Sequence, residues 1–276
     1  MTKYAWRIYL CVIFAILYIP IVTLILFSFN ASSSTAEFSG FSFRWYRALF
    51  DEETRGVTFA ALRNTLILAV LSSLISTVIG TAAAEGIYKM KNKLVRKAVT
   101  SVTNIPMMNP EIVTGMSMML LFVAVASILR TEYENIGFGA MLIAHITFCL
   151  PYVILSVLPR INELGDSLSE AALDLGCTPL QAFFKVKLPN IMPGVISGMV
   201  MAFTLSLDDF VISYFVGSSN FQTLPLLIYS MTKKKVTPDM YALSTIIVVA
   251  VFVLLLISNM KKEHGSATKR AGGKKK

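Results

Sequence analysis

Long apolar runs separated by polar segments dominate the chain. Each run approaches the roughly 20 residues that a helix needs to cross a bilayer. The predicted spans cover residues about 8–29, 62–86, 99–129, 137–158, 191–216 and 241–260. The pattern therefore predicts an all-α membrane protein with six transmembrane helices.

Two of these runs need a further comment. The first exceeds the 7–15 apolar residues of a signal-peptide core, so we expect it to be retained as a span. The third, 99–129, is too long for a straight crossing. Pro106 and Pro110 in "NIPMMNPEIV" predict a break in it near the cytoplasmic side.

The composition agrees with this class of protein. Hydrophobic residues make up 55% of the 276 residues and charged residues only 15%, against about 25% charged in soluble domains. The net charge of +9 is explained by basic residues that flank membrane spans, so a nucleic-acid partner is not indicated. Cys11, Cys149 and Cys177 stand apart, and no metal site is predicted.

The distribution of basic residues predicts the orientation. Most of the 25 Lys and Arg residues fall on the side of the N-terminus, so both termini are expected in the cytoplasm. Residues 1–260 would form the membrane domain. Residues 261–276 would form a basic, disordered cytoplasmic tail.

The inner loop over residues 160–190 contains two helix starts. Ser167 with Glu170, and Thr178 with Gln181, have the spacing of capping boxes, and Pro179 occupies the favoured first helical position. Gly176 is placed to end the first helix in a left-handed conformation. Two short helices joined by a tight turn are predicted.

The first of these helices carries a narrow apolar stripe. Leu168, Ala171, Ala172 and Leu175 recur at helical spacing, and the two alanines would let another helix or groove approach closely. The spacing alone also fits a loop that packs on the inner ends of its own spans. A longer pattern decides between these alternatives.

Glu170-Ala171-Ala172 is followed by Gly176 after three residues, and by Val186-x-Leu188-Pro189 after nine more. This stretch resembles the cytoplasmic signature of permease subunits of ABC importers. The resemblance implies a permease fold of the type I importer kind, with residues 167–176 as the coupling helix that docks on an ATPase subunit. It assigns ATPase coupling to Glu170, Ala171, Ala172, Asp174, Leu175, Gly176, Leu188 and Pro189.

The energy source implied by the resemblance is a separate ATPase. The sequence has no Gly-x-x-x-x-Gly-Lys-Ser/Thr phosphate loop, so this chain is not expected to be an enzyme or to hold a cofactor. ATP and Mg²⁺ would be bound by the partner ATPase.

Four further stretches, "YIPIVTLILFSFN", "HITFCLPYVI", "TLSLDDFVISYFV" and "LPLLIYSMTKKKVTPDMYALSTI", are similar to permeases of spermidine/putrescine importers, and most to the second of two paralogous subunits, the PotC type. The resemblance implies a location in the bacterial cytoplasmic membrane. It also implies three partners: a paralogous permease, an ATPase dimer and an extracytoplasmic polyamine-binding protein.

The charges inside the spans favour a cationic cargo independently of this resemblance. Asp208, Asp209 and Glu111 lie in or beside spans that contain no deep Lys or Arg, and such carboxylates are costly in a membrane. Adjacent helical positions point about 100° apart, so we expect only one of the two aspartates to face the pathway. Glu85 is interpreted as an ordinary residue of the inner membrane interface.

Aromatic faces would complement these acids. Trp45, Tyr46 and Tyr214 are candidates for cation–π contacts with ammonium groups, although Trp and Tyr are also enriched as anchors at membrane interfaces. Two alternative functions remain open: an ABC permease for another small cation, and a secondary transporter or channel in which Asp208, Asp209 and His145 relay cations or protons. No convincing inverted repeat supports the second.

Overall fold

The computed structural model describes residues 3–32, 37–49, 52–132, 137–218, 221–234, 240–246 and 248–249. The chain divides into two compact units, one formed by residues 1–58 and 228–276 and the other by residues 59–227. Helices make up the regular structure of the described ranges, with two isolated β-bridges. Five of these helices are long and apolar enough to cross a membrane.

The first unit contains α1 (Lys3–Phe27) and the short α2 (Arg44–Ala48). The side chains of α1 are exposed along its apolar length, as expected for a helix that faces lipid. Helix α2, which contains Trp45 and Tyr46, is five residues long. Most of the sixth predicted span, 241–260, and the whole tail, 261–276, lie outside the described residues.

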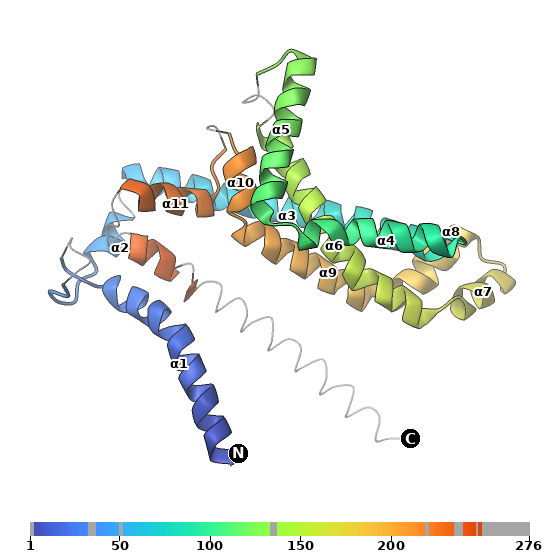
Figure 1. Cartoon of the computed structure of the whole chain (residues 1–276), viewed down its shortest axis with the longest axis horizontal. Helices are drawn as coiled ribbons and strands as arrows, with labels where there is room; N and C mark the ends of the chain where they lie inside the picture. Colours follow the sequence, from blue (N-terminus) through green and yellow to red (C-terminus); the bar gives the residue numbers. More distant parts are fainter. Residues whose placement is uncertain are drawn as a thin grey trace. The chain divides into compact units, whose positions relative to one another are not determined.

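The second unit is a helical bundle that ends in the inner loop (Figure 1). Its elements are α3 (Glu52–Lys89, from residue 59), α4 (Lys93–Met108), α5 (Glu111–Leu129), α6 (Gly137–Leu164), α7 (Ser167–Asp174), α8 (Pro179–Ala182), the π-helical segment η2 (Phe183–Lys187), α9 (Leu188–Asp208), α10 (Val211–Val216) and the start of α11 (Leu224–Lys234). In Figure 1, α6 lies beside α9, and α5 beside α10.

Two predicted spans are divided in the structure. The stretch 99–129 belongs to α4 and α5, which are separated at Asn109 and Pro110. Pro106 lies inside α4, so only Pro110 marks the break, and the prediction that both prolines interrupt the helix was wrong for Pro106. The stretch 191–216 is divided between α9 and α10 beside the two aspartates.

Small residues let the helices of the bundle approach closely. A Cβ atom on Gly194 would lie 2.9 Å from the Ser156 carbonyl oxygen, and one on Gly198 would lie 3.2 Å from the Val153 Cα atom. Such small-residue contacts replace the hydrophobic driving force that helices lack within lipid. The core that results contains side chains of α3, α6, α9 and α10.

Gly80 provides a test of this packing. A Cβ atom there would lie 2.7 Å from the Val153 Cγ1 atom, closer than carbon atoms can approach. We expect Gly80→Val to lower the free energy of unfolding by about 1–3 kcal/mol through overpacking, measured as thermal unfolding in detergent. Gly86→Val is the matched control in the same helix, because nothing lies within 4 Å of its added Cβ atom. Equal unfolding midpoints for both variants would contradict the assigned contact between α3 and α6.

Candidate functional site

The helix break beside the two aspartates gives them different environments. Asp208 is the last residue of α9, whereas the backbone of Asp209 is extended, with φ −61° and ψ 123°. Asp208 is exposed, and Asp209 is only 8% exposed. Within this chain the carboxylate of Asp208 is therefore exposed and that of Asp209 is buried, and the expectation that only one of them faces the pathway stays a prediction.

The buried carboxylate of Asp209 is bound to the first turn of α10. Its Oδ1 atom accepts a hydrogen bond from the Ile212 N–H at 3.2 Å, and its Oδ2 atom accepts one from the Ser213 N–H at 2.8 Å. Amide groups in a first turn have no partner within the helix, and a negative charge there is favoured. Asp209 therefore fixes the start of α10.

His145 on α6 contacts the carboxylate of Asp209. Its Nε2 atom is 3.4 Å from Asp209 Oδ2 and 3.3 Å from Ser213 Oγ. Its Nδ1 atom is 2.8 Å from Ser206 Oγ, which in turn accepts a hydrogen bond of 2.8 Å from the Ser72 hydroxyl on α3. His145 is fully buried, so these contacts provide the partners that a buried polar side chain requires.

This polar network joins four helical elements, and we did not predict it from the sequence. It contains one side chain from α3, one from α6, one from α9 and one from α10, together with Asp209 at the break. The signal available in the sequence was a set of polar residues in apolar spans, Ser72, His145, Ser206 and Ser213. Such residues are expected to find one another across helices.

Asp208, Glu111 and Tyr214 have exposed side chains, and we call these three the candidate pathway residues. Glu111 lies in the first turn of α5. Helix α5 packs on α10 so closely that a Cβ atom on Gly115 would lie 2.9 Å from the Phe215 ring. Tyr214 is 44% exposed and its ring lies 5.6 Å from that of Phe210. Carboxylates and an aromatic face of this kind suit ammonium groups.

Trp45 and Tyr46 belong to the other unit, and contacts within that unit hold them. The Trp45 indole N–H donates to the Asn30 carbonyl at 2.7 Å, and the Tyr46 hydroxyl lies 2.8 Å from Ser28 Oγ. The Tyr46 ring also lies 5.1 Å from that of Phe29. The contacts that the structure assigns to these two rings are therefore anchoring contacts of the outer loop.

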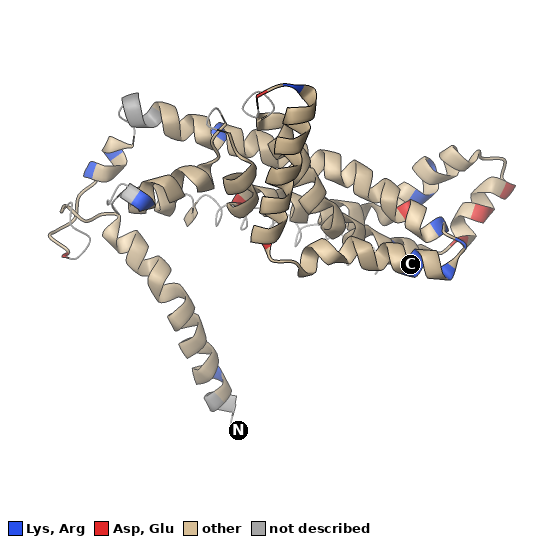
Figure 2. Ribbon diagram, turned by 45° about the horizontal axis from the view of Figure 1, so that its top comes forward, with Lys and Arg blue, Asp and Glu red and all other residues tan. Residues whose placement is uncertain are grey.

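At the other end of the second unit, the inner loop forms the two predicted short helices, and charged residues gather there (Figure 2). The capping box of Thr178 and Gln181 is confirmed, with Pro179 in the first turn of α8. Gly176 has φ +85°, as predicted. The prediction of a capping box formed by Ser167 and Glu170 was wrong, because Ser167 already lies within α7. The N-cap of α7 is Asp166, and its side chain makes no capping hydrogen bond.

The surface of α7 differs from the predicted stripe in one respect. Ala172 is only 6% exposed, so the chain itself covers it, whereas Leu168 is 45% and Leu175 is 86% exposed. Glu170, Ala171, Asp174 and Gly176 are also exposed. In the second part of the signature, Leu188 is half-buried and Pro189 is exposed in the first turn of α9. The exposed apolar residues of the stripe therefore include Leu168 of α7 and its C-cap Leu175, but not Ala172.

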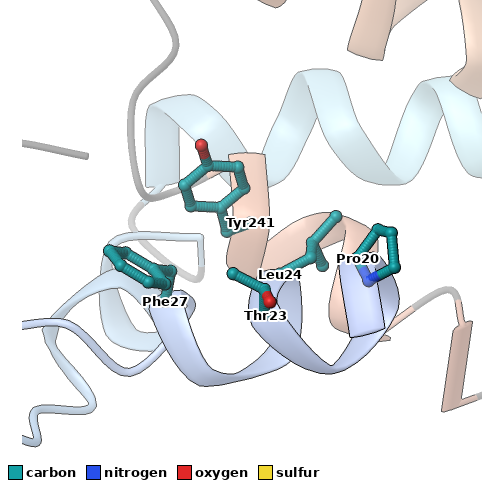
Figure 3. A pocket seen from close by; sticks show the side chains of 5 residues that line it. All are labelled: Pro20, Thr23, Leu24, Phe27 and Tyr241. Carbon is teal, nitrogen blue, oxygen red and sulfur yellow. The ribbon is translucent and has the colours of Figure 1, made fainter. Parts of the chain in front are cut away.

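A cavity of about 410 Å³ lies in the first unit, lined by Pro20, Thr23, Leu24, Phe27 and Tyr241 (Figure 3). The Thr23 hydroxyl donates to the Ile19 carbonyl within α1. The lining contains no carboxylate, so this cavity lacks the groups expected to bind a cation and contains none of the predicted site residues.

Comparison with known proteins agrees with the helical architecture and the signature loop. Residues 76–261 match the family described as "Binding-protein-dependent transport system inner membrane component". The putrescine transport system permease protein PotI of Escherichia coli K12 is 37% identical over 92% of this chain and 89% of its own length. The spermidine/putrescine transport system permease protein PotC of Haemophilus influenzae is 36% identical over 91% of this chain and 94% of its own.

A solved structure shares the fold. A chain of a bacterial ABC transporter that imports the acidic polysaccharide alginate superposes with a TM-score of 0.74 at 20% identity, covering 94% of both chains. The all-α membrane permease fold expected from the sequence is thereby confirmed. With a family match over most of the chain and full-length relatives, this protein belongs to the binding-protein-dependent transport system inner membrane components.

Proposed function

We propose that this chain is a permease subunit of an ATP-driven importer for polyamines, with spermidine and putrescine as the cargo. The observation that carries the proposal is Asp208, an exposed carboxylate at a helix break in a chain that resembles putrescine and spermidine/putrescine permeases over nine-tenths of its length. The fold alone does not identify the cargo, because a chain of the same fold belongs to an ABC transporter that imports an acidic polysaccharide.

The charge of the candidate pathway residues supports a cationic cargo. Asp208 and Glu111 are exposed, and carboxylates in membrane segments characteristically mark pathways for ions or substrates. A polyamine offers several ammonium groups separated by methylenes, so it can contact a carboxylate and the Tyr214 ring together. Other small cations would use the same groups, and competition experiments separate these cargoes.

The assembly that we propose contains four kinds of subunit. A paralogous permease would complete the pathway, two ATPase subunits that bind ATP and Mg²⁺ would dock on α7, and an extracytoplasmic binding protein would deliver the cargo. The exposed Leu168 and Leu175 support docking at α7. The excess of Lys and Arg in the segments on the side of the N-terminus supports cytoplasmic termini. Binding and hydrolysis of ATP would then shift the permease between outward-facing and inward-facing states.

Uptake by the reconstituted assembly tests this function. We expect proteoliposomes that contain all four kinds of subunit to accumulate labelled spermidine or putrescine only when ATP is present on the side of the ATPase. Unlabelled polyamines should compete, while thiamine and sulfate should not. ATP-independent uptake by this chain alone would instead indicate a secondary transporter or channel, and competition by thiamine but not by polyamines would indicate a different cationic cargo.

A further inference from the structure

A buried ion pair connects the inner loop to α3. The Lys187 ammonium lies 2.9 Å from Oε1 and 2.8 Å from Oε2 of Glu85, and it also lies 4.5 Å from the centre of the Tyr88 ring. The Lys187 side chain is 3% exposed and that of Glu85 is 12% exposed. Glu85 therefore does more than the interface role expected from its sequence.

The energetics of this pair point to a role other than stability. Removing two charges from water is costly, and their mutual attraction often only compensates for that cost. A well-packed neutral pair would hold the same helices together comparably well. The ion pair fixes the position of Lys187, because its ammonium without the carboxylate of Glu85 would be strongly unfavourable in that buried place.

Lys187 lies where the inner loop becomes a membrane helix. It is the last residue of η2, a π-helical segment, and α9 begins at the next residue. Segments of π-helix are rare and are frequently found at functional sites. Lys187 also occupies the unspecified position of the Val186-x-Leu188-Pro189 pattern, so the family signature does not itself require a cation there.

Glu85, the partner of Lys187, is connected to Asp209 by helix α3 and a series of hydrogen bonds. Glu85 and Ser72 lie on the same helix, α3, separated by 13 positions or about 20 Å at 1.5 Å per residue. The Ser72 hydroxyl donates to Ser206, which contacts His145, and His145 contacts Asp209. A series of contacts thus connects the inner loop, through α3, to the helix break beside Asp208, and such networks of packed and hydrogen-bonded side chains can carry coupling between distant sites.

We infer that the Glu85–Lys187 ion pair transmits the movement of the inner loop to α3, and through α3 to the polar network behind Asp208. This inference rests on the proposed function, in which an ATPase moves α7. Lys187 and Glu85 are positioning residues in this account, since neither contacts cargo or nucleotide. Movement of η2 would be transmitted to α3 through this pair.

The test compares charged and neutral versions of the pair in the complete assembly. Glu85→Gln alone leaves the buried Lys187 ammonium without its carboxylate, and we expect poor assembly. The double variant Glu85→Gln/Lys187→Met removes both charges, and we expect it to assemble and hydrolyse ATP like the wild type. Its ratio of polyamine transported to ATP hydrolysed should nevertheless fall about fivefold or more, the lower end of typical coupling effects.

Two further variants make the result decisive. The exchange Glu85→Lys/Lys187→Glu restores the attraction and should recover much of the transport ratio. Lys89→Gln is the matched control, because Lys89 contacts the same carboxylate at 3.1 Å but is 68% exposed, and it should keep the wild-type ratio. A wild-type ratio in the neutral double variant, or a double variant that fails to assemble, would overturn the inference by showing a purely structural role.

The same experiment separates this inference from the proposed function. ATP-dependent uptake by the wild-type assembly tests the function, and the transport ratio of the variants relative to wild type tests the ion pair. A wild-type assembly without ATP-dependent uptake would overturn the function and, with it, the inference. Normal wild-type uptake with an unchanged ratio in the double variant would overturn the inference alone.

Discussion

Asparagine in place of Asp208 is expected to reduce polyamine uptake about tenfold or more, because a hydrogen bond to a charged group contributes about 1.5–3 kcal/mol and 1.4 kcal/mol corresponds to a factor of ten. Asp208 is exposed at the end of α9, so the substitution removes a charge without removing a contact of the fold. The measurement is the initial rate of ATP-dependent uptake at several polyamine concentrations, with the thermal stability of the assembly measured in parallel.

Asp209→Asn should separate the two aspartates, because the main loss there is one of stability. An asparagine has a single carbonyl oxygen, so it cannot accept from both the Ile212 and the Ser213 N–H groups with separate oxygens. Loss of such a cap costs about 0.5–2 kcal/mol. We therefore expect a lower unfolding temperature for Asp209→Asn, whereas Asp208→Asn should unfold at the wild-type temperature.

An exposed carboxylate outside the pathway serves as the control for charge. Glu163 is 65% exposed and pairs with Arg160 on the surface at 2.8 Å, and Glu163→Gln makes the same change of charge as Asp208→Asn. Its uptake should equal that of wild type. Unchanged uptake in Asp208→Asn would refute a role of this residue in the cargo pathway, and equal losses of uptake in Asp208→Asn and Glu163→Gln would point to a general effect of net charge.

The second large effect is expected at Leu175, the most exposed leucine of the inner loop. Its side chain is 86% exposed, so Leu175→Glu leaves the packing of this chain intact. If α7 docks on the ATPase, the new carboxylate would be buried in that interface without a partner, which costs about 1–3 kcal/mol or more. We expect ATP-dependent uptake to fall about tenfold or more, together with weaker capture of the ATPase in detergent.

Leu94→Glu provides the matched control, since Leu94 is 80% exposed and lies on α4, outside the signature loop. It should retain both uptake and the bound ATPase. If Leu175→Glu kept normal uptake, α7 would not be the docking element. Ala172 is a poorer place for this test, although it belongs to the signature, because it is buried within the chain and a larger residue there would disturb the loop itself.

The inner loop shows which structural features short sequence patterns can predict. The cap of α8, the proline in its first turn and the left-handed glycine after α7 were all predicted correctly. Each depends on residues within three or four positions of one another, which interact whenever the segment is helical. The orientation of α7 depends on distant neighbours instead, so the local pattern did not show which members of its apolar stripe the chain itself buries, as it buries Ala172.

The difference between local patterns and distant contacts also explains how much of the candidate site could be predicted. The sequence by itself determined the apolar spans, the presence of carboxylates within them and the signature of the inner loop, because hydrophobicity and short-range spacing are properties of contiguous residues. Which aspartate is buried, how His145 meets Ser206 and Asp209 across 61 and 64 positions, and the pairing of Lys187 with Glu85 across 102 positions were decided only by the tertiary structure. Helix packing alone brings such distant polar groups together in a medium where each must find a partner.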